Sequence, residues 1–137
     1  MSLSENLSVT YRVSPSVTND ELNLVYGAAW GKDATYDFQP ALRHSLAYVC
    51  AYADDQLVGF VNLAWDGGVH AFILDTTVHP HWQRRGIGQA LVERAVAVAR
   101  ERGLEWVHVD FEPHLLHFYR RCGFRHTEAG VIDLVNT

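Results

Sequence analysis

The sequence has few cysteines, no surplus of positive charge and no long hydrophobic run, and each absence excludes a class of protein. Two cysteines, Cys50 and Cys122, stand far apart without a metal-binding or redox spacing, so we expect buried thiols in a reducing compartment. The formal net charge of -5 argues against a nucleic-acid-binding protein, which usually carries a basic excess. No stretch approaches the roughly 18 apolar residues of a membrane span, and the polar N-terminus lacks the apolar run of a signal peptide. We therefore expect a cytoplasmic protein that binds neither nucleic acid nor membrane.

What is present is the composition of an ordinary globular domain. The 137 residues can bury a core that needs no disulfide or metal. Hydrophobic residues make up 48% of the chain and charged residues 20%, which is typical of soluble globular proteins. A single domain over residues 1–137 is expected, with residues 1–7 either disordered or a remnant of the expression vector.

Hydrophobic periodicity predicts alternating strands and helices. Alternation predicts a strand over 8–13, and Thr18, three residues before Glu21, predicts a capping box that starts a helix. Apolar residues at three- and four-residue spacings predict an amphipathic helix over 88–102. The apolar run 71–74 predicts a central strand covered on both faces. The other predicted elements are a short helix at 41–45, strands at 46–53, 57–65, 69–78 and 105–111, a helix at 114–121 and a final strand at 131–135.

The strongest functional motif is the glycine-containing loop Gln83-Arg84-Arg85-Gly86-Ile87-Gly88, which follows a strand and precedes a helix. The first amides of a helix have no partner within it, and the helix dipole places partial positive charge there. Gly86 and Gly88 remove the side chains that would keep a ligand away from these amides. The loop therefore predicts a phosphate or pyrophosphate site. The alternative is a plain strand-to-helix turn with solvated arginines.

The spacing Q-x-x-G-x-G, after a strand that ends in Val78-His79-Pro80, resembles the Gcn5-related N-acetyltransferase (GNAT) superfamily, whose pyrophosphate loop holds acetyl-CoA. A second segment, Phe118-Tyr119-Arg120-Arg121-Cys122-Gly123-Phe124, resembles the Y-x-x-x-G-F segment of the same family. The resemblance extends over nearly the whole chain. It implies an α+β fold in three layers (α/β/α), with a twisted, mostly antiparallel sheet and one parallel strand-helix-strand crossover within residues 71–111. Such a crossover is normally right-handed.

The resemblance implies that acetyl-CoA is the co-substrate and that its acetyl group passes directly to a primary amine. No cysteine lies where an acyl-enzyme would be expected, so transfer is expected to be sequential. The exposed backbone of the fourth strand would pair with the pantetheine amides like an added strand, and a backbone N–H would polarise the thioester carbonyl. The residues expected to bind the cofactor are Thr76, Thr77, Val78, Gln83, Arg84, Arg85, Gly86, Ile87, Gly88, Gln89 and Tyr119.

Three side chains are expected to move protons. The resemblance implies that Tyr119 lies near the CoA sulfur and protonates the leaving thiolate, general acid help that is worth about 10²–10⁴-fold; the alternative is a buried aromatic with a satisfied hydroxyl. Asp75 or Glu112 would take the proton of the amine, because burial in an apolar strand raises the pKa of a carboxyl group. For Asp75 the alternative is a structural hydrogen bond to a loop amide. Glu112 and Leu115 stand where many relatives carry Asn and Ala, so the family's pantetheine contact does not carry over to Glu112.

Two other functions fit parts of the sequence. Departures at Glu112 and Leu115 would suit a non-catalytic module that binds acyl-CoA without transferring the acyl group. A zinc site would draw on a cluster of suitable ligand types, but Pro113 divides the cluster and there is no H-E-x-x-H pattern, so no metal is expected. The residues of this cluster are His108, Asp110, Glu112, His114 and His117.

The acceptor is expected to be an amine on a small molecule or a peptide. Three aromatic residues, Trp30, Tyr36 and Phe38, lie in the region that forms one wall of the acceptor site in GNAT proteins, and they favour an apolar or cationic acceptor. The alternative is that these rings only fill the edge of the core. Family members often dimerise, so a homodimer is one expected assembly.

Overall fold

The computed structural model describes residues 8–31, 33 and 35–136, so the expectation for residues 1–7 lies outside the described part of the chain. The elements in chain order are β1 (Val9–Val13), α1 (Asn19–Trp30), α2 (Gln39–Arg43), β2 (Ser45–Ala53), β3 (Gln56–Trp65), β4 (His70–Val78), a 3-10 turn at Pro80–Trp82, α3 (Ile87–Glu101), β5 (Trp106–His108), a second 3-10 turn at Pro113–Leu115 and α4 (Leu116–Arg121).

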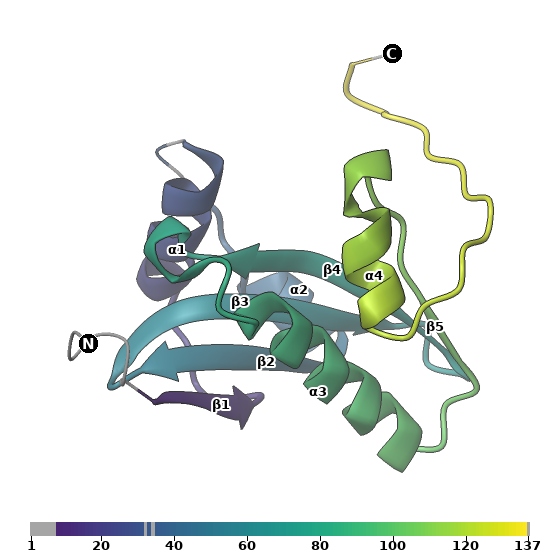
Figure 1. Ribbon diagram of the computed structural model, residues 1–137, viewed down its shortest axis with the longest axis horizontal. Coiled ribbons are helices and arrows are strands. Elements are labelled where there is room, and N and C mark those ends of the chain that lie inside the picture. Colours follow the sequence, from purple (N-terminus) through teal and green to yellow (C-terminus); the bar gives the residue numbers. More distant parts are fainter. Residues whose placement is uncertain (1–7, 32, 34, 137) are drawn as a thin grey trace.

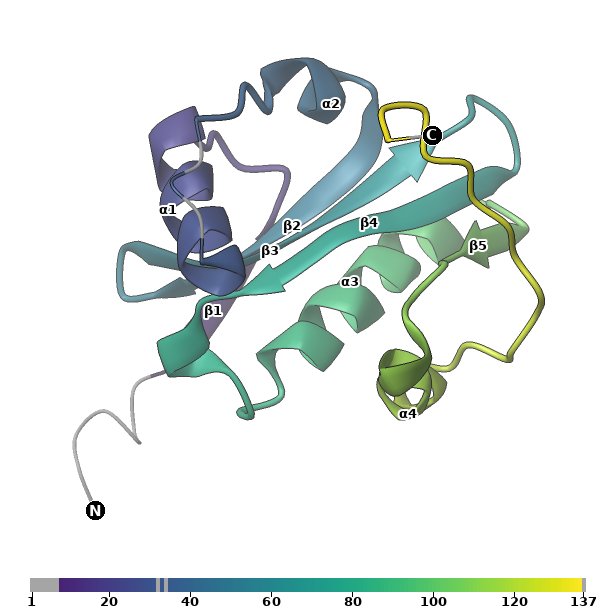
Figure 2. The ribbon, with the colours of Figure 1, turned by 90° about the horizontal axis from the view of Figure 1, so that it is seen from above.

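The five strands form one sheet in the order β1-β2-β3-β4-β5. Strands β1 to β4 pair antiparallel, whereas β4 and β5 pair parallel, with Ala71 opposite Val107. Helix α3 makes the connection between these two parallel strands. Helices α1 and α2 cover one face of the sheet, and α3 and α4 cover the other (Figures 1 and 2). The predicted three-layer α+β fold with one parallel crossover is confirmed.

Alternation along the strands sends one set of apolar side chains to each helical layer. The larger core cluster lies between the sheet and α3 and includes Leu63 and Leu91, both fully buried. The smaller cluster lies under α1 and includes Leu22, Val25 and Cys50. Burial raises the pKa of the Cys50 thiol to about 12, so this cysteine behaves as a small core residue.

The capping box that starts α1 is present as predicted. The side-chain oxygen of Thr18 accepts a hydrogen bond from the Glu21 amide at 3.1 Å, and the Glu21 carboxylate accepts one from the Thr18 amide at 3.0 Å. These two bonds satisfy amides that would otherwise lack partners at the helix N-terminus. They fix where α1 begins, and hence which of its faces lies on the sheet.

The expectation that β4 is covered on both faces is wrong. Ala71 and Ile73 are buried against α3, but Phe72 is 39% exposed and Leu74 is 42% exposed on the opposite face. The reason is that α1 and α2 do not extend over the part of the sheet near β5, as Figure 2 shows. The apolar run 71–74 is therefore buried by helices on one face of the sheet only.

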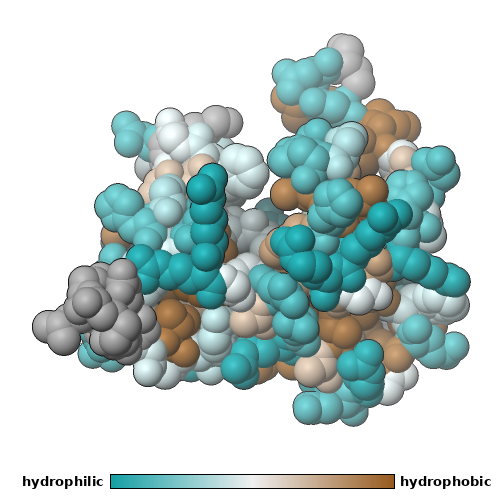
Figure 3. All heavy atoms as spheres, viewed as in Figure 1, coloured by the Kyte–Doolittle hydropathy of each residue, from teal (hydrophilic) through white to brown (hydrophobic). Residues whose placement is uncertain are grey.

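The predicted final strand at 131–135 is also wrong, and the strand predicted at 105–111 is much shorter. Strand β5 spans only Trp106–His108, so little edge is available to pair with a further strand. The chain after α4 runs as a coil beside α4 (Figure 1), in the upper-right region where Figure 3 shows hydrophobic brown spheres. Four side chains of this coil, Val131, Ile132, Leu134 and Val135, are 80% to 88% exposed.

Candidate active site

Strand β4 contains a bulge at Asp75. Thr77 pairs with Phe60 and Leu74 pairs with Asn62, so two residues of β4, Asp75 and Thr76, stand opposite one residue of β3. Asp75 has a left-handed backbone (φ 60), which costs a residue with a side chain about 1–3 kcal/mol. Bulges of this kind re-aim side chains and often lie beside active sites.

The pairing of β4 with β5 stops before this bulge. The last paired residues are Phe72 on β4 and His108 on β5, so the stretch Leu74–Val78 has no strand on that side within the described part of the chain. Its backbone groups therefore remain available at the point where the two strands diverge. An extended ligand with amide groups can pair with such an edge.

The loop before α3 places a left-handed glycine at the helix N-terminus. Gly86 is the N-cap residue of α3, with φ 79, and a Cβ atom built on it would meet nothing within 4 Å. The side-chain amide of Gln83 donates to the backbone oxygen of Val78 at 3.1 Å and ties the loop to β4. Open space in front of unpaired helix amides is the arrangement that binds phosphate groups.

Gly88 has a different role, because it lets α4 approach α3. A Cβ atom on Gly88 would lie 3.3 Å from carbon atoms of the Phe118 ring, which is tighter than ordinary packing. A side chain at this position would push α4 away from the loop. The glycine of α3 and the aromatic segment of α4, which the sequence predicted separately, thus meet in one place.

A cavity of about 470 Å³ lies where β4, the loop, α3 and α4 come together. Figure 1 shows α4 standing beside β4 and α3 here, and in Figure 3 the surface is indented between the α1 side and the α4 side of the molecule. The lining residues are Thr76, Val78, Trp82, Gln83, Arg84, Gly86, Ile87, Gly88, Gln89, Leu115, Phe118, Tyr119 and Arg121. Nine of the eleven residues expected to bind the cofactor are in this set.

The other two expected cofactor residues lie outside the cavity lining. Thr77 is buried, and its hydroxyl donates to the backbone oxygen of Asp75 at 2.9 Å, which stabilises the bulge. The Arg85 guanidinium lies over the Trp82 ring at 4.9 Å. Arg121 also lines the cavity, although the sequence did not predict a role for it. The sequence shows only that a positively charged residue stands two positions after Tyr119.

Tyr119 lines the cavity and is only 6% exposed. Its hydroxyl donates to the hydroxyl oxygen of Thr76 at 3.5 Å. The ring stacks on Phe111 at 4.8 Å between centroids and meets Phe118 edge-on at the same distance. Desolvation raises the pKa of Tyr119, opposed by the hydrogen bond with Thr76, so the phenol keeps its proton at neutral pH and can donate it.

The two candidate bases are in different environments. Both side chains are exposed, but the protein around the bulge still desolvates the Asp75 carboxyl group enough to raise its pKa. Burial raises the pKa of the Tyr26 hydroxyl on α1, the helix that packs over β3 and β4, and the charge of Asp75 raises it further. Glu112 is exposed at the start of a 3-10 turn and does not line the cavity.

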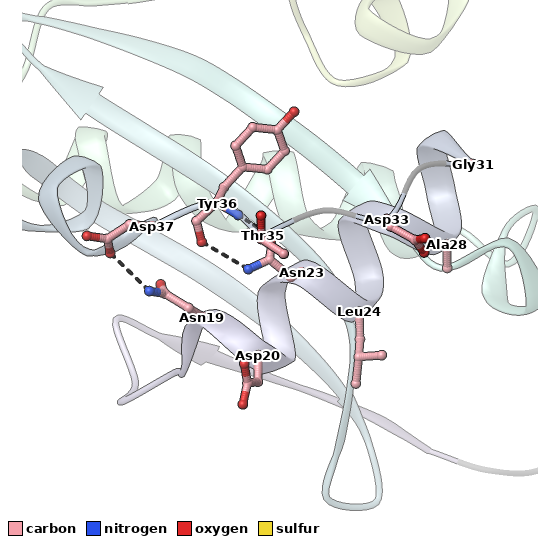
Figure 4. Close-up of a pocket in the computed structure, with 11 residues that line it drawn as sticks. Asn19, Asp20, Asn23, Leu24, Ala28, Gly31, Asp33, Thr35, Tyr36 and Asp37 are labelled. Carbon is pink, nitrogen blue, oxygen red and sulfur yellow. Dashed lines mark hydrogen bonds between the residues drawn. The ribbon is translucent and has the colours of Figure 1, made fainter.

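A larger hollow, of about 970 Å³, lies along α1 next to Asp33 and residues 35–37 (Figure 4). It contains neither the loop around Gly86 nor Tyr119. Size alone therefore does not identify the site, and we assign the chemistry to the smaller cavity because it unites the helix N-terminus with a buried proton donor.

The histidine-rich segment does not form a metal centre. Among the described residues, no three His, Cys, Asp or Glu side chains lie close enough to hold a metal ion. The His108 ring instead contacts His70, with Nδ1 of His70 2.7 Å from Nε2 of His108, and stacks on Phe72. Along the part of the chain with assigned structure, no helix is long and apolar enough to cross a membrane.

Comparison with known families now defines the class of protein. A model of the acetyltransferase (GNAT) family matches residues 17–124, which is most of the chain. The chain belongs to the GNAT acetyltransferase family, as its motifs indicated.

Individual relatives agree with this assignment. The chain is 30% identical to GCN5-related N-acetyltransferase 1, chloroplastic, of Arabidopsis thaliana over 90% of its own length and 64% of the relative's. It is 28% identical to an uncharacterized N-acetyltransferase of Porphyra purpurea over 74% of its length and 61% of that protein. It therefore spans about three fifths of these relatives. A GNAT-family acetyltransferase structure from Streptococcus pneumoniae superimposes with a TM-score of 0.76 at 26% identity, over 95% of this chain and 100% of the other.

Proposed function

We propose that the protein transfers an acetyl group from acetyl-CoA to a primary amine by direct attack of the amine on the thioester. The observation that carries the proposal is the cavity that joins the N-terminus of α3, the unpaired edge of β4 and the buried Tyr119 hydroxyl. These three features match the three parts of acetyl-CoA, which are a diphosphate, a chain with two amides and a sulfur that leaves as thiolate.

The residues of the cavity suit each part of the co-substrate. The diphosphate would lie on the amides at the start of α3, next to the guanidinium groups of Arg84 and Arg121, which also line the cavity. The pantetheine amides would pair with the β4 backbone from Thr76 to Val78, the stretch that has no neighbouring strand on the β5 side among the described residues. Acetyl-CoA bound in this way supplies the activated acetyl group.

The protein's own part in the reaction is to move two protons. Asp75 would take the proton that the amine loses as its nitrogen bonds to the acetyl carbon. Tyr119 would give its proton to the sulfur as the carbon–sulfur bond breaks, and Thr76 would hold the phenol in place. Neither Asp75 nor Glu112 lines the cavity, but Asp75 fits the role of base better, because desolvation raises the pKa of its carboxyl group and it adjoins Thr76, which does line the cavity.

The second candidate is a module that binds acyl-CoA without transferring the acyl group. Glu112 favours it, since many relatives carry at this position an Asn that contacts pantetheine, and Glu112 does not line the cavity. Two measurements separate the candidates, namely calorimetric binding of acetyl-CoA and a thiol-release screen across amine classes. A transferase binds acetyl-CoA and releases thiol with some amine. Binding without release for every amine supports the module, and absence of binding contradicts both candidates.

A further inference from the structure

An uncovered hydrophobic face lies on β4 and β5, in the part of the sheet that α1 and α2 do not reach (Figure 2). Three side chains, Phe72, Leu74 and Trp106, are between 39% and 48% exposed there, and we call them the open face. They lie close together, because Phe72 and Leu74 point to the same side of β4 and Trp106 pairs in register with His70 on that side. Single exposed hydrophobic residues are ordinary, but a contiguous group of them marks an interaction surface.

The open face borders a cavity of about 490 Å³ at the free edge of the sheet. The lining residues that come from the coil after α4 begin at Gly123 and end at Ala129. Among the described residues, no backbone hydrogen bond joins β5 to residues 125–136. The coil therefore stands off from the last strand and leaves both the open face and the strand edge accessible.

The end of the coil presents a second hydrophobic surface. In residues 131–135, which we call the terminal segment, four of the five side chains are hydrophobic and are 80% to 88% exposed. The chain has already passed the cavity at Ala129, and Figure 1 shows it standing away from the sheet beyond that point. The terminal segment therefore does not cover the open face of its own chain.

Each of the two surfaces also carries a charge that the other can pair with. The Arg125 guanidinium lies over the Trp106 ring of the open face, 5.9 Å from the ring centroid. Asp110 and Glu128 also line the cavity, but neither has a ring contact with the open face among the described residues. The charged residue of the terminal segment is Asp133, whose carboxylate accepts hydrogen bonds from the backbone next to it and has no Lys or Arg partner in the described part of the chain. A carboxylate that docks on the open face can pair with the guanidinium there.

We propose that two copies of this chain form a symmetric dimer in which the terminal segment of each copy covers the open face of the other. Every copy presents both a hydrophobic segment and a hydrophobic face, so a two-fold axis satisfies both surfaces twice. Removal of apolar surface from water drives the association, and Asp133 of each copy meets Arg125 of the other. None of these residues lines the cavity that contains Gly86 and Tyr119, so the inference does not depend on acetyl transfer.

Sedimentation velocity of the full chain over a range of concentrations tests the proposal. We expect an equilibrium between monomer and dimer with a Kd in the micromolar range. A chain that stays monomeric at about 100 µM, where a micromolar dimer is almost fully formed, would overturn the proposal. Hydrogen exchange that shows protected terminal-segment amides in the monomer would also overturn it, because the segment would then cover its own chain.

Variants test each surface separately. Leu134→Asp in the terminal segment and Phe72→Asp in the open face should each raise the Kd of the dimer about tenfold or more, since either change removes a buried hydrophobic side chain from both contacts. Leu24→Asp is the matched control, because Leu24 is 75% exposed on α1 and belongs to neither surface. Urea unfolding verifies that each variant is folded, and Phe72→Ser replaces Phe72→Asp if the latter is not. An unchanged Kd in either surface variant would contradict the proposal.

A mixture of the two surface variants distinguishes exchanged segments from other dimers. The Leu134→Asp copy keeps its open face and the Phe72→Asp copy keeps its terminal segment, so a mixed dimer retains one of the two contacts, whereas neither variant retains any contact with itself. We therefore expect the mixture to associate about tenfold more tightly than either variant alone. A mixture that associates no more tightly would overturn the exchange, because that is the result for dimers that pack face against face or segment against segment.

Discussion

The hydroxyl of Tyr119 on α4 donates a hydrogen bond to the hydroxyl of Thr76 on β4, with 3.5 Å between the two oxygen atoms. This contact joins α4 to the bulged strand, and both residues line the cavity. Thr76 has its position because the bulge at Asp75 puts two residues of β4 opposite one residue of β3. The bulge therefore presents Thr76 to Tyr119, while the charge of Asp75 acts on the Tyr26 hydroxyl of α1.

Thr76→Val removes the acceptor of the Tyr119 hydrogen bond and keeps the shape of the side chain. A single hydrogen bond is worth about 0.5–1.5 kcal/mol, so we expect kcat to fall about twofold to tenfold. Steady-state kinetics should show the change in kcat while the affinity for acetyl-CoA stays within about twofold, and Thr76→Ser should restore the rate. If serine fails to rescue turnover, Thr76 does not position the phenol.

Gly86→Val should abolish detectable binding of acetyl-CoA. The substitution fills the space in front of the α3 amides and strains a backbone with φ 79, and the strain alone should cost about 1–2 kcal/mol of unfolding free energy. Gly103→Val is the matched control, because Gly103 has φ 78, open space around its Cβ position and a location beyond the other end of α3. Calorimetric titration should show loss of binding only in the Gly86 variant, with similar destabilisation of both. Equal affinity in the two variants would exclude the loop as the diphosphate site.

Asp75→Asn should make the protein more stable than the wild type at pH 7. Desolvation raises the pKa of Asp75 in the folded state, so the folded protein holds this proton more tightly than the unfolded chain does. The wild type therefore loses stability as the pH rises from about 4, where an unfolded Asp ionises, through the higher folded pKa. Urea unfolding between pH 3 and pH 8 should show the two proteins converging at the acid end. A gap that stays constant with pH would show that the carboxylate is not destabilised by its surroundings.

The sequence was enough to predict the elements whose signals are local. The Thr18 and Glu21 capping box predicted where α1 begins, and the Q-x-x-G-x-G spacing predicted a glycine at the N-terminus of α3. Helix α2 begins two residues earlier than expected because Pro40 fits the first turn of a helix. These helix starts could be predicted because a capping box, a glycine or a proline acts on residues within one or two helical turns of itself.

Features that depend on distant neighbours were not predictable in this way. The left-handed backbone of Asp75 depends on the register between β3 and β4, and no residue type announced it. The exposure of Phe72 and Leu74 depends on how far α1 and α2 reach across the sheet. Arg121 enters the cavity through the way α4 packs beside α3, so its place in the lining follows only from tertiary structure.

The most direct test of the account is the rate of thiol release by Tyr119→Phe at saturating acetyl-CoA and saturating amine. The variant keeps the ring and its contacts with Phe111 and Phe118, so affinity for acetyl-CoA should be unchanged. We predict a fall in kcat of about 10²–10⁴-fold, the usual contribution of a general acid. Tyr11→Phe, a tyrosine of β1 that lies under Arg94, is the control and should turn over like the wild type. A Tyr119→Phe variant with undiminished kcat would contradict the role of the phenol as proton donor.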